Sequence, residues 1–179
     1  MAKAAGTLGV IVTIVTLLGM IGSPVLMALF GMGWFEAYLA GEPEGEKYQH
    51  ASFLLKITFP YLWFITFVAL SGAILNTYNK FAVAAFSPVF LNIAMIGAAI
   101  LLTPYVDDAA TSLAWGVFLG GVLQFVFQLP FLAKAGLLVK PRWAWHDEHV
   151  TRIRKLMLPA LFGVSVSQIN LLLDAIIAS

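Results

Sequence analysis

Long runs of apolar residues alternate with short polar connections along the chain. The runs lie at residues 5–30, 54–75, 82–103, 112–132 and 156–178. Each is close to the length of about 20 residues that a helix needs to cross the hydrocarbon core of a bilayer. In lipid, only helices and closed barrels satisfy their backbone polar groups, and barrel strands alternate over about ten residues. The pattern therefore predicts five transmembrane helices.

The first apolar run resembles a secretory signal, because a lysine precedes it. It continues from Ala4 to Phe30, however, which is longer than the roughly 7–15 residues of a signal core. Further apolar runs follow it. We interpret it as the first transmembrane helix.

Composition supports a membrane protein. The 179 residues are 61% hydrophobic and 11% charged, with a mean hydropathy of +0.92. Soluble domains are about 45–50% apolar and about 25% charged, and a soluble fold of this size cannot hide so much apolar surface. The predicted fold class is all-α, a polytopic membrane protein. The chain has no cysteine, which excludes disulfides and thiolate chemistry.

Successive connections between the predicted spans lie on opposite sides of the membrane, and the charged residues are distributed unevenly between these two sides. One side carries Lys3, Lys80, Lys134, Lys140, Arg142, Arg152, Arg154 and Lys155. The other carries Lys47 and Lys56 with Glu36, Glu42, Glu44, Glu46, Asp107 and Asp108. Cytoplasmic connections carry the excess of Lys and Arg. We therefore predict that the N-terminus, the turn at 76–80 and residues 133–155 are cytoplasmic.

Residues 133–155 are predicted to form a basic, amphipathic connection at the membrane surface. Trp143 and Trp145 lie among the cations of this segment, a combination typical of anchoring at the headgroup level. Binding of one specific lipid headgroup is the alternative. Generic anchoring is the interpretation that the pattern favours.

Polar residues within the apolar runs are candidates for a cavity or for helix packing. Gln124 and Gln128 lie four residues apart, on the face of a helix that also carries Gly116 and Gly120. Small residues at this spacing let helices approach closely, and two amides at membrane depth are expected to face a partner helix or a wet cavity. Asn92 is a similar candidate in the preceding run.

The last run contains a carboxylate, Asp174, among leucines and isoleucines. At helical spacing, Asp174 shares one stripe with Asn170, Ser167 and Gly163. A charge at the bilayer centre costs at least about 2.5 kcal/mol, so such a residue usually faces a bundle interior. Carboxylate, amide and hydroxyl oxygens suit a hard cation such as Na⁺.

Two interpretations of Asp174 remain open from spacing alone. It forms an ion or proton site with Asn170 and Ser167, or it lies at the far membrane surface, some nineteen residues after Lys155. No other metal site is indicated, because His50, His146 and His149 lie in polar connections without a third ligand at a defined spacing. The runs contain no HExxH sequence and no nucleophile–histidine pair, so an intramembrane enzyme is the weakest hypothesis.

Several stretches resemble the MurJ/MviN family, the lipid II flippases of bacterial cell-wall synthesis. The resemblance is carried by "GAILNTYNKF", "SPVFLNI" and "GVSVSQI", within residues 54–98, 113–132 and 158–179. It implies a fourteen-helix transporter of two lobes, of which this chain covers about helices three to seven as a fragment. Residues 1–132 would belong to the N-terminal lobe, 133–155 to a cytoplasmic connection, and 156–179 to the first helix of the C-terminal lobe.

The resemblance also implies a function and a role for Asp174. Family members carry lipid II across the bacterial inner membrane by alternating access, and the arginines that receive its diphosphate would lie outside this chain. Some members bind Na⁺ through an acidic residue of the seventh helix, a position that Asp174 matches. The expected partners are lipid II, membrane lipids and the remaining helices of the full protein, with no nucleic acid and no cofactor besides Na⁺. The alternatives are a multidrug or polysaccharide exporter of the same superfamily and a membrane interaction protein without transport activity.

Overall fold

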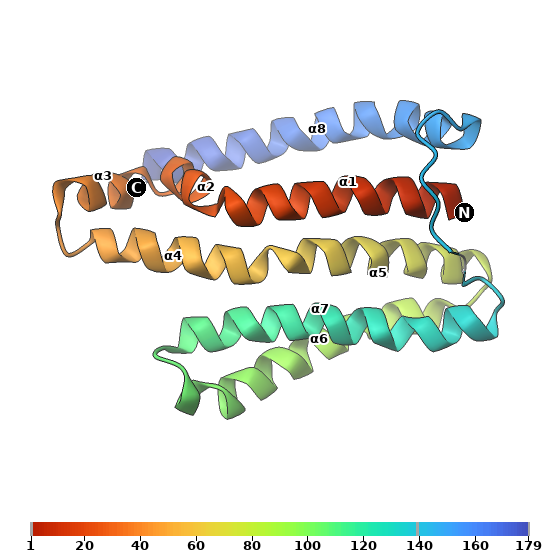
Figure 1. Cartoon of the computed structure of the whole chain (residues 1–179), viewed down its shortest axis with the longest axis horizontal. Helices are drawn as coiled ribbons and strands as arrows, with labels where there is room; N and C mark the ends of the chain where they lie inside the picture. Colours follow the sequence, from red (N-terminus) through yellow and green to blue (C-terminus); the bar gives the residue numbers. More distant parts are fainter. Residues whose placement is uncertain (1, 139, 179) are drawn as a thin grey trace.

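The computed structural model describes residues 2–138 and 140–178, and it shows a bundle of helices joined by short connections (Figure 1). The helices are α1 (Ala2–Ile21), α2 (Ser23–Phe30), α3 (Met32–Ala40), α4 (Gly45–Thr58), α5 (Pro60–Thr77), α6 (Phe81–Leu101), α7 (Ala109–Lys134) and α8 (Glu148–Ala178), with a single 3₁₀ turn, η1 (Thr103–Tyr105). Five helical spans in the described residues are long and apolar enough to cross a membrane. The predicted all-α class and the five spans are confirmed.

The predicted helix at 5–30 is wrong as a single element, because the chain breaks at Gly22 between α1 and α2. Pro24 lies in the first turn of α2, where its missing N–H leaves the carbonyl of Met20 without the usual helical donor. The hydroxyl of Ser23 donates to that carbonyl at 3.0 Å instead. Hydropathy could not reveal this break, since proline and serine sit among uniformly apolar neighbours.

The stretch between the first two spans was predicted as a polar connection, but most of it is helical. It forms α3 and the start of α4, and α4 continues almost directly into α5 at Pro60. The second span thus begins near Gly45 rather than at residue 54. Tyr48 explains why this polar stretch folds: its ring centroid lies 5.2 Å from those of Phe35 and Tyr38, and its hydroxyl donates to the carbonyl of Pro24 at 2.8 Å.

Helices α6 and α7 form the most extensive helix pair. Gly116 and Gly120 of α7 lie directly against Leu91, Ala94 and Ala98 of α6. Small residues on both sides permit this close approach. Helix α7 is capped by Asp108, which accepts a hydrogen bond from the backbone N–H of Thr111 at 2.8 Å.

The bundle has two chemically different ends (Figure 1). The N-terminus, the α5–α6 turn and the α7–α8 connection lie at one end, which we call the basic end because the lysines and arginines of those segments gather there. Helix α3 and the α6–α7 connection lie at the other, the acidic end, with Glu36, Asp107 and Asp108. The alternation of sides expected from five spans is therefore present.

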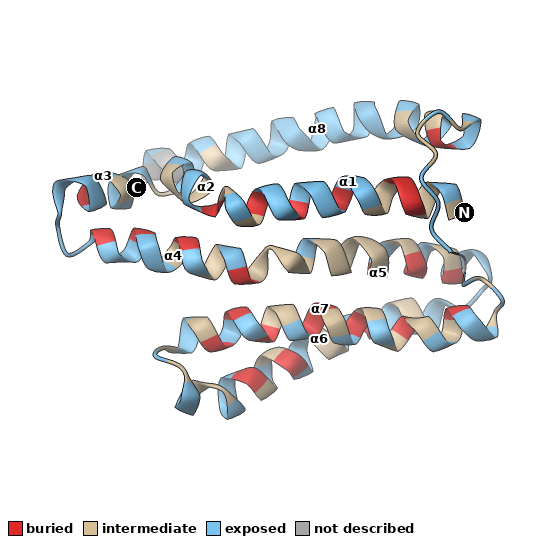
Figure 2. Ribbon diagram, in the orientation of Figure 1, coloured by how far each residue is buried: buried red, intermediate tan, exposed pale blue. Residues whose placement is uncertain are grey.

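Helix α8 runs beside α1 and is exposed along most of its length (Figure 2). It begins at Glu148, so the helix starts eight residues before the apolar run at 156–178. Asp147 explains the earlier start: its carboxylate accepts from the N–H of His149 at 3.1 Å, and its carbonyl accepts from the N–H of Thr151 at 2.8 Å. Both bonds satisfy amides that the first turn of a helix leaves without partners.

Candidate functional site

The polar stripe of α8 comprises Gly163, Ser167, Asn170 and Asp174. Helix α8 is continuous through these residues, so they share one face, and all four are exposed. The hydroxyl of Ser167 donates to the carbonyl of Gly163 at 3.5 Å. Among the residues that the structure describes, α8 packs mainly against α1, and Asp174 belongs to no group of three histidine, cysteine or carboxylate side chains that could hold a metal ion. One helix alone cannot complete the coordination shell of a hard cation.

The length of α8 also bears on where Asp174 lies. At the helical rise of about 1.5 Å per residue, Asp174 is roughly 28 Å from Lys155, close to the hydrocarbon thickness of about 30 Å. With Lys155 at the basic end, Asp174 lies toward the acidic end of the bundle. In Figure 1 the C-terminal end of α8 lies at the same end of the bundle as α2 and α3.

Gln124 and Gln128 lie together in a pocket between α5, α6 and α7 whose lining is otherwise mostly apolar. The pocket has a volume of about 310 Å³, and the two glutamines are 2% and 1% exposed. The hydroxyl of Tyr61 donates to Oε1 of Gln124 at 3.3 Å. Ser87 of α6, which is 2% exposed, also lines this pocket. The α7 amides are thus brought to a site that three helices share.

Asn92, the remaining candidate, lies elsewhere. Its side chain is exposed on α6 and does not line the pocket. The structure therefore separates the intramembrane candidates into the α8 stripe, the Gln124–Gln128 pocket and an outward-facing Asn92.

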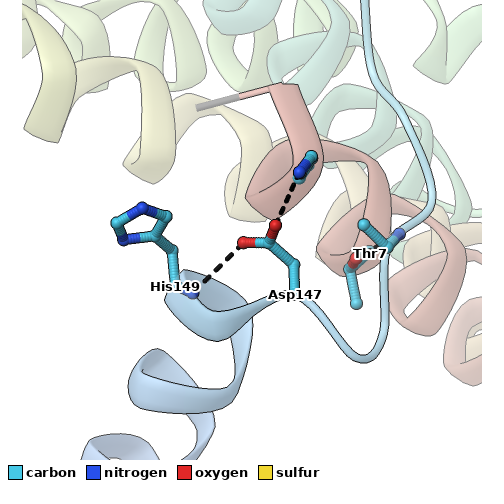
Figure 3. Close-up of polar contacts among 5 residues, drawn as sticks. Thr7, Asp147 and His149 are labelled. Carbon is cyan, nitrogen blue, oxygen red and sulfur yellow. Dashed lines mark hydrogen bonds and ion pairs between the residues drawn. The ribbon is translucent and has the colours of Figure 1, made fainter.

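Residues 140–147, which we call the docked connection, pack on the first turns of α1. The N–H of Arg142 donates to the carbonyl of Ala2 at 2.9 Å, and the N–H of Ala144 donates to Oγ1 of Thr7 at 3.2 Å. Nζ of Lys3 and Oδ2 of Asp147 form an ion pair of 2.6 Å (Figure 3). This segment was predicted as a surface anchor, and these contacts make it part of the folded bundle as well.

The tryptophans of the docked connection contact each other and α8. The rings of Trp143 and Trp145 are stacked, with centroids 5.8 Å apart. The guanidinium of Arg154 lies 4.2 Å from the centre of the Trp145 ring, a favourable cation–π arrangement. Trp143 is 55% exposed and remains available to the membrane surface.

A histidine–carboxylate contact joins α4 to the N-cap residue of α7 at the acidic end. Nε2 of His50 lies 3.3 Å from Oδ2 of Asp108. The hydrogen bond from the N–H of Thr111 is the main cause that lowers the pKa of Asp108. His50 lies in α4 rather than in the connection where we expected it. The other two histidines flank the start of α8, and the described residues contain no cluster of three potential metal ligands.

The family model described as "Lipid II flippase MurJ" matches residues 1–179.

The chain belongs to the lipid II flippase MurJ family.

A relative from Haemophilus influenzae, a probable lipid II flippase MurJ, is 66% identical over 177 residues, which cover 99% of this chain and 35% of the relative. A Vibrio cholerae relative with the same description is 65% identical over 178 residues, covering 99% of this chain and 34% of that protein. The Lipid II flippase MurJ of Burkholderia cenocepacia is 37% identical over 160 residues, or 86% of this chain and 31% of that protein.

The chain therefore spans about a third of the length of the curated relatives that it matches. Membership of the MurJ family, with five apolar spans, makes it a multi-pass membrane protein.

Sequence reasoning missed two features of this MurJ-family segment. Ser87 was a detectable signal, because it is a small polar residue inside the apolar run at 82–103. The docked connection left almost no signal, since the donors of Arg142 and Ala144 are backbone amides, which every residue except proline has. Gly6, over which the backbone of Arg142 passes, was the only local indication.

The Lys3–Asp147 pair predicts an acid-induced release of the docked connection. The hydrogen bond from Lys3, followed by those from the N–H groups of His149 and Val150, lowers the pKa of Asp147 below its usual value of 3.8. A depressed pKa stabilises the folded state above that value, and the stabilisation is lost as the pH falls through the folded-state pKa. We expect docking to be constant at neutral pH and to weaken below about pH 4.

Tryptophan fluorescence measures this release. Replacing Trp34, Trp63 and Trp115 by phenylalanine leaves Trp143 and Trp145 of the docked connection as the fluorescent residues. The signal of Trp143 and Trp145 should change below about pH 4. The Lys3→Met variant, which lacks the pair, should show a weaker acid transition. An unchanged transition in Lys3→Met would show that Asp147 is not its source.

Proposed function

We propose that this chain is a transmembrane segment of a lipid II flippase, which carries lipid II across the bacterial inner membrane. The observation that carries the proposal is the match of the MurJ family model to residues 1–179, supported by relatives that are 66% and 65% identical. The proposed activity is transport without a chemical reaction, so the protein supplies differential binding in two conformations rather than catalytic groups.

In this proposal the docked connection is the joint between two moving parts. Helices α1 to α7 form one packed body, which corresponds to the proposed N-terminal lobe of residues 1–132 and extends to Lys134. Helix α8 packs mainly on α1 and is otherwise exposed, so it is free to belong to a second lobe. The bonds from Arg142 and Ala144 to α1 fix the start of α8 while leaving the rest of that helix able to change its neighbours.

The proposed orientation places the basic end in the cytoplasm. The N-terminus, the α5–α6 turn and the docked connection share that end (Figure 1), and cytoplasmic segments carry the excess of Lys and Arg. Membrane lipids are additional partners in this proposal, because exposed Trp143 beside Arg142 suits the headgroup region.

Complementation tests the proposal. In what we call the full-length transplant, this chain replaces the matching segment of the Haemophilus influenzae relative. The full-length transplant should restore growth, and lipid II at the outer face of the membrane, in a strain depleted of its own lipid II flippase. Export of drugs or of a polysaccharide lipid without restored growth would favour the alternative function of a multidrug or polysaccharide exporter of the same superfamily. A stable protein without any transport would favour a membrane interaction protein.

We also propose that Asp174 is the charged ligand of a Na⁺ site, with Asn170 and Ser167 as supporting oxygen ligands. The support is their common stripe on a continuous α8, together with the exposure of that stripe to further helices. A carboxylate, an amide and a hydroxyl are ligands that Na⁺ accepts, and helices beyond this chain would have to complete the shell.

Asp174→Asn in the full-length transplant tests the ion site, because it removes the charge and keeps the shape. The apparent Na⁺ affinity of transport should fall at least about tenfold, since even the loss of an outer-shell partner typically has this effect. The matched control is Ser165→Ala, on the opposite face of α8, which should leave Na⁺ dependence unchanged. Full Na⁺ dependence in Asp174→Asn would disprove the site without touching the lipid II proposal.

A further inference from the structure

The pocket between α5, α6 and α7 contains buried polar atoms without partners. Oε1 of Gln128 and Oγ of Ser87 are fully shielded by protein atoms, yet neither has a hydrogen-bond partner among the residues that the structure describes. Both side chains line the pocket. Buried polar groups in native proteins are nearly always hydrogen-bonded, to protein or to ordered water.

From these atoms we infer that the pocket is a hydration site, which holds ordered water within the membrane-spanning region. A water molecule occupies about 30 Å³ in the liquid, so the pocket volume of about 310 Å³ admits several. Water needs two to four polar partners. Gln124 and Asn76 offer theirs directly, and a small rotation of the Gln128 and Ser87 side chains brings their shielded oxygens to the pocket.

The composition of the pocket selects water over a charged ligand. Its lining contains no titratable side chain, only the two glutamines, Ser87 and Asn76 among apolar residues. An ion at this depth would need a charged partner or a full shell of oxygen ligands. Neutral amides and a hydroxyl instead offer both donors and acceptors, which water matches equally well.

In this inference, water enters the pocket from the basic end. Asn76, in the last turn of α5, is exposed and lines the pocket. Gln128 and Gln124 lie roughly 9 and 15 Å from the end of α7 at the helical rise. The polar lining thus leads from the basic end to a depth of about half the hydrocarbon core. This inference concerns α5–α7 alone and does not depend on which substrate the protein carries.

Cysteine labelling tests the inference, because the chain has no cysteine of its own. Only the thiolate reacts, and a thiol needs water to ionise. The probe is a membrane-impermeant methanethiosulfonate, applied to the full-length transplant with any cysteine of the relative replaced by serine. Ala69→Cys lines the pocket, and Val126→Cys, 52% exposed on α7, lies outside it at the same depth of roughly 12 Å.

Ala69→Cys should react at least about tenfold faster than Val126→Cys, and only with reagent added at the basic end. Two further substitutions distinguish labelling through a hydrated pocket from labelling caused by local opening of a helix. Gln128→Leu removes the polar wall, and Gly72→Leu fills the space beside Gln128, whose Nε2 lies 3.9 Å from where a Cβ on Gly72 would stand. Each should slow the labelling of Ala69→Cys toward the Val126→Cys rate.

Three results would overturn the inference. Ala69→Cys that reacts no faster than Val126→Cys would show that lipid or other helices fill the pocket. Labelling from the acidic end would place the entrance on the wrong side. Labelling that stays fast in both Gln128→Leu and Gly72→Leu would show that the reagent reaches Ala69 without passing along the polar residues of the pocket.

Discussion

Gly120→Leu is expected to separate α6 from α7 and to lower the free energy of unfolding by about 3 kcal/mol, the upper end of the usual cost of overpacking. A Cβ at position 120 would stand 2.6 Å from Cδ1 and 3.1 Å from Cα of Leu91. The Leu91 side chain can rotate away, but its backbone cannot move without moving α6. The whole helix pair must therefore open.

Gly97→Leu is the matched control for this prediction. Gly97 lies in α6 itself, and a Cβ at that position would meet nothing within 4 Å. Leucine is the better helix former by up to about 1 kcal/mol, so Gly97→Leu should leave stability unchanged or raise it slightly. Denaturation in mixed micelles, followed by circular dichroism, measures both variants. Equal losses in both would show that helix propensity, not the α6–α7 contact, controls stability here.

The sequence predicts the number of spans well because the cost of placing polar groups in lipid is large and acts on every residue of a span. It predicts the ends of spans less well. Gly22 breaks an apolar run without changing its hydropathy, and the start of α4 is helical although it is polar. Pro24 and Ser23 decide the first case locally, and the tertiary contacts of Tyr48 with Phe35 and Tyr38 decide the second.

For the candidate sites, too, the sequence predicts local features and not tertiary contacts. Helical periodicity correctly places Gln124 and Gln128 on one face, and it places Asp174 with Asn170 and Ser167 on another. Periodicity does not say which neighbouring helix a face will meet. Tyr61 and Ser87 come to the glutamines from two other helices, and that meeting depends on how α5 and α6 cross α7.

The charge pattern is partly predictable from the sequence and partly visible only in the fold. It separates the connections into two sets, and the fold gathers each set at one end of the bundle (Figure 1). Within the basic set, however, the charges have different roles. Lys3 is paired with Asp147 and Arg154 covers Trp145, so part of the positive charge holds the docked connection in place.

Gly6→Ala is expected to release the docked connection from α1. A Cβ on Gly6 would overlap backbone atoms of Arg142, so a methyl group cannot be accommodated by turning a side chain. The connection must lift, which breaks the bond from Arg142 to Ala2 and the bond from Ala144 to Thr7. Overpacking of about 1–3 kcal/mol corresponds to a 5- to 150-fold increase in the open population.

Trypsin measures this opening at the Arg142–Trp143 bond, because cleavage follows the open population when opening is fast. Lys140 does not interfere, since Pro141 follows it. Cleavage at Arg142 should accelerate about 5- to 150-fold in Gly6→Ala and remain unchanged in Gly163→Ala, where a Cβ on α8 meets nothing within 4 Å. Lys3→Met should give a smaller acceleration, because it removes only the exposed ion pair and leaves both backbone bonds. If Lys3→Met matched Gly6→Ala, the ion pair rather than the close backbone contact would hold the connection, and the start of α8 would be secured by charge instead of by packing.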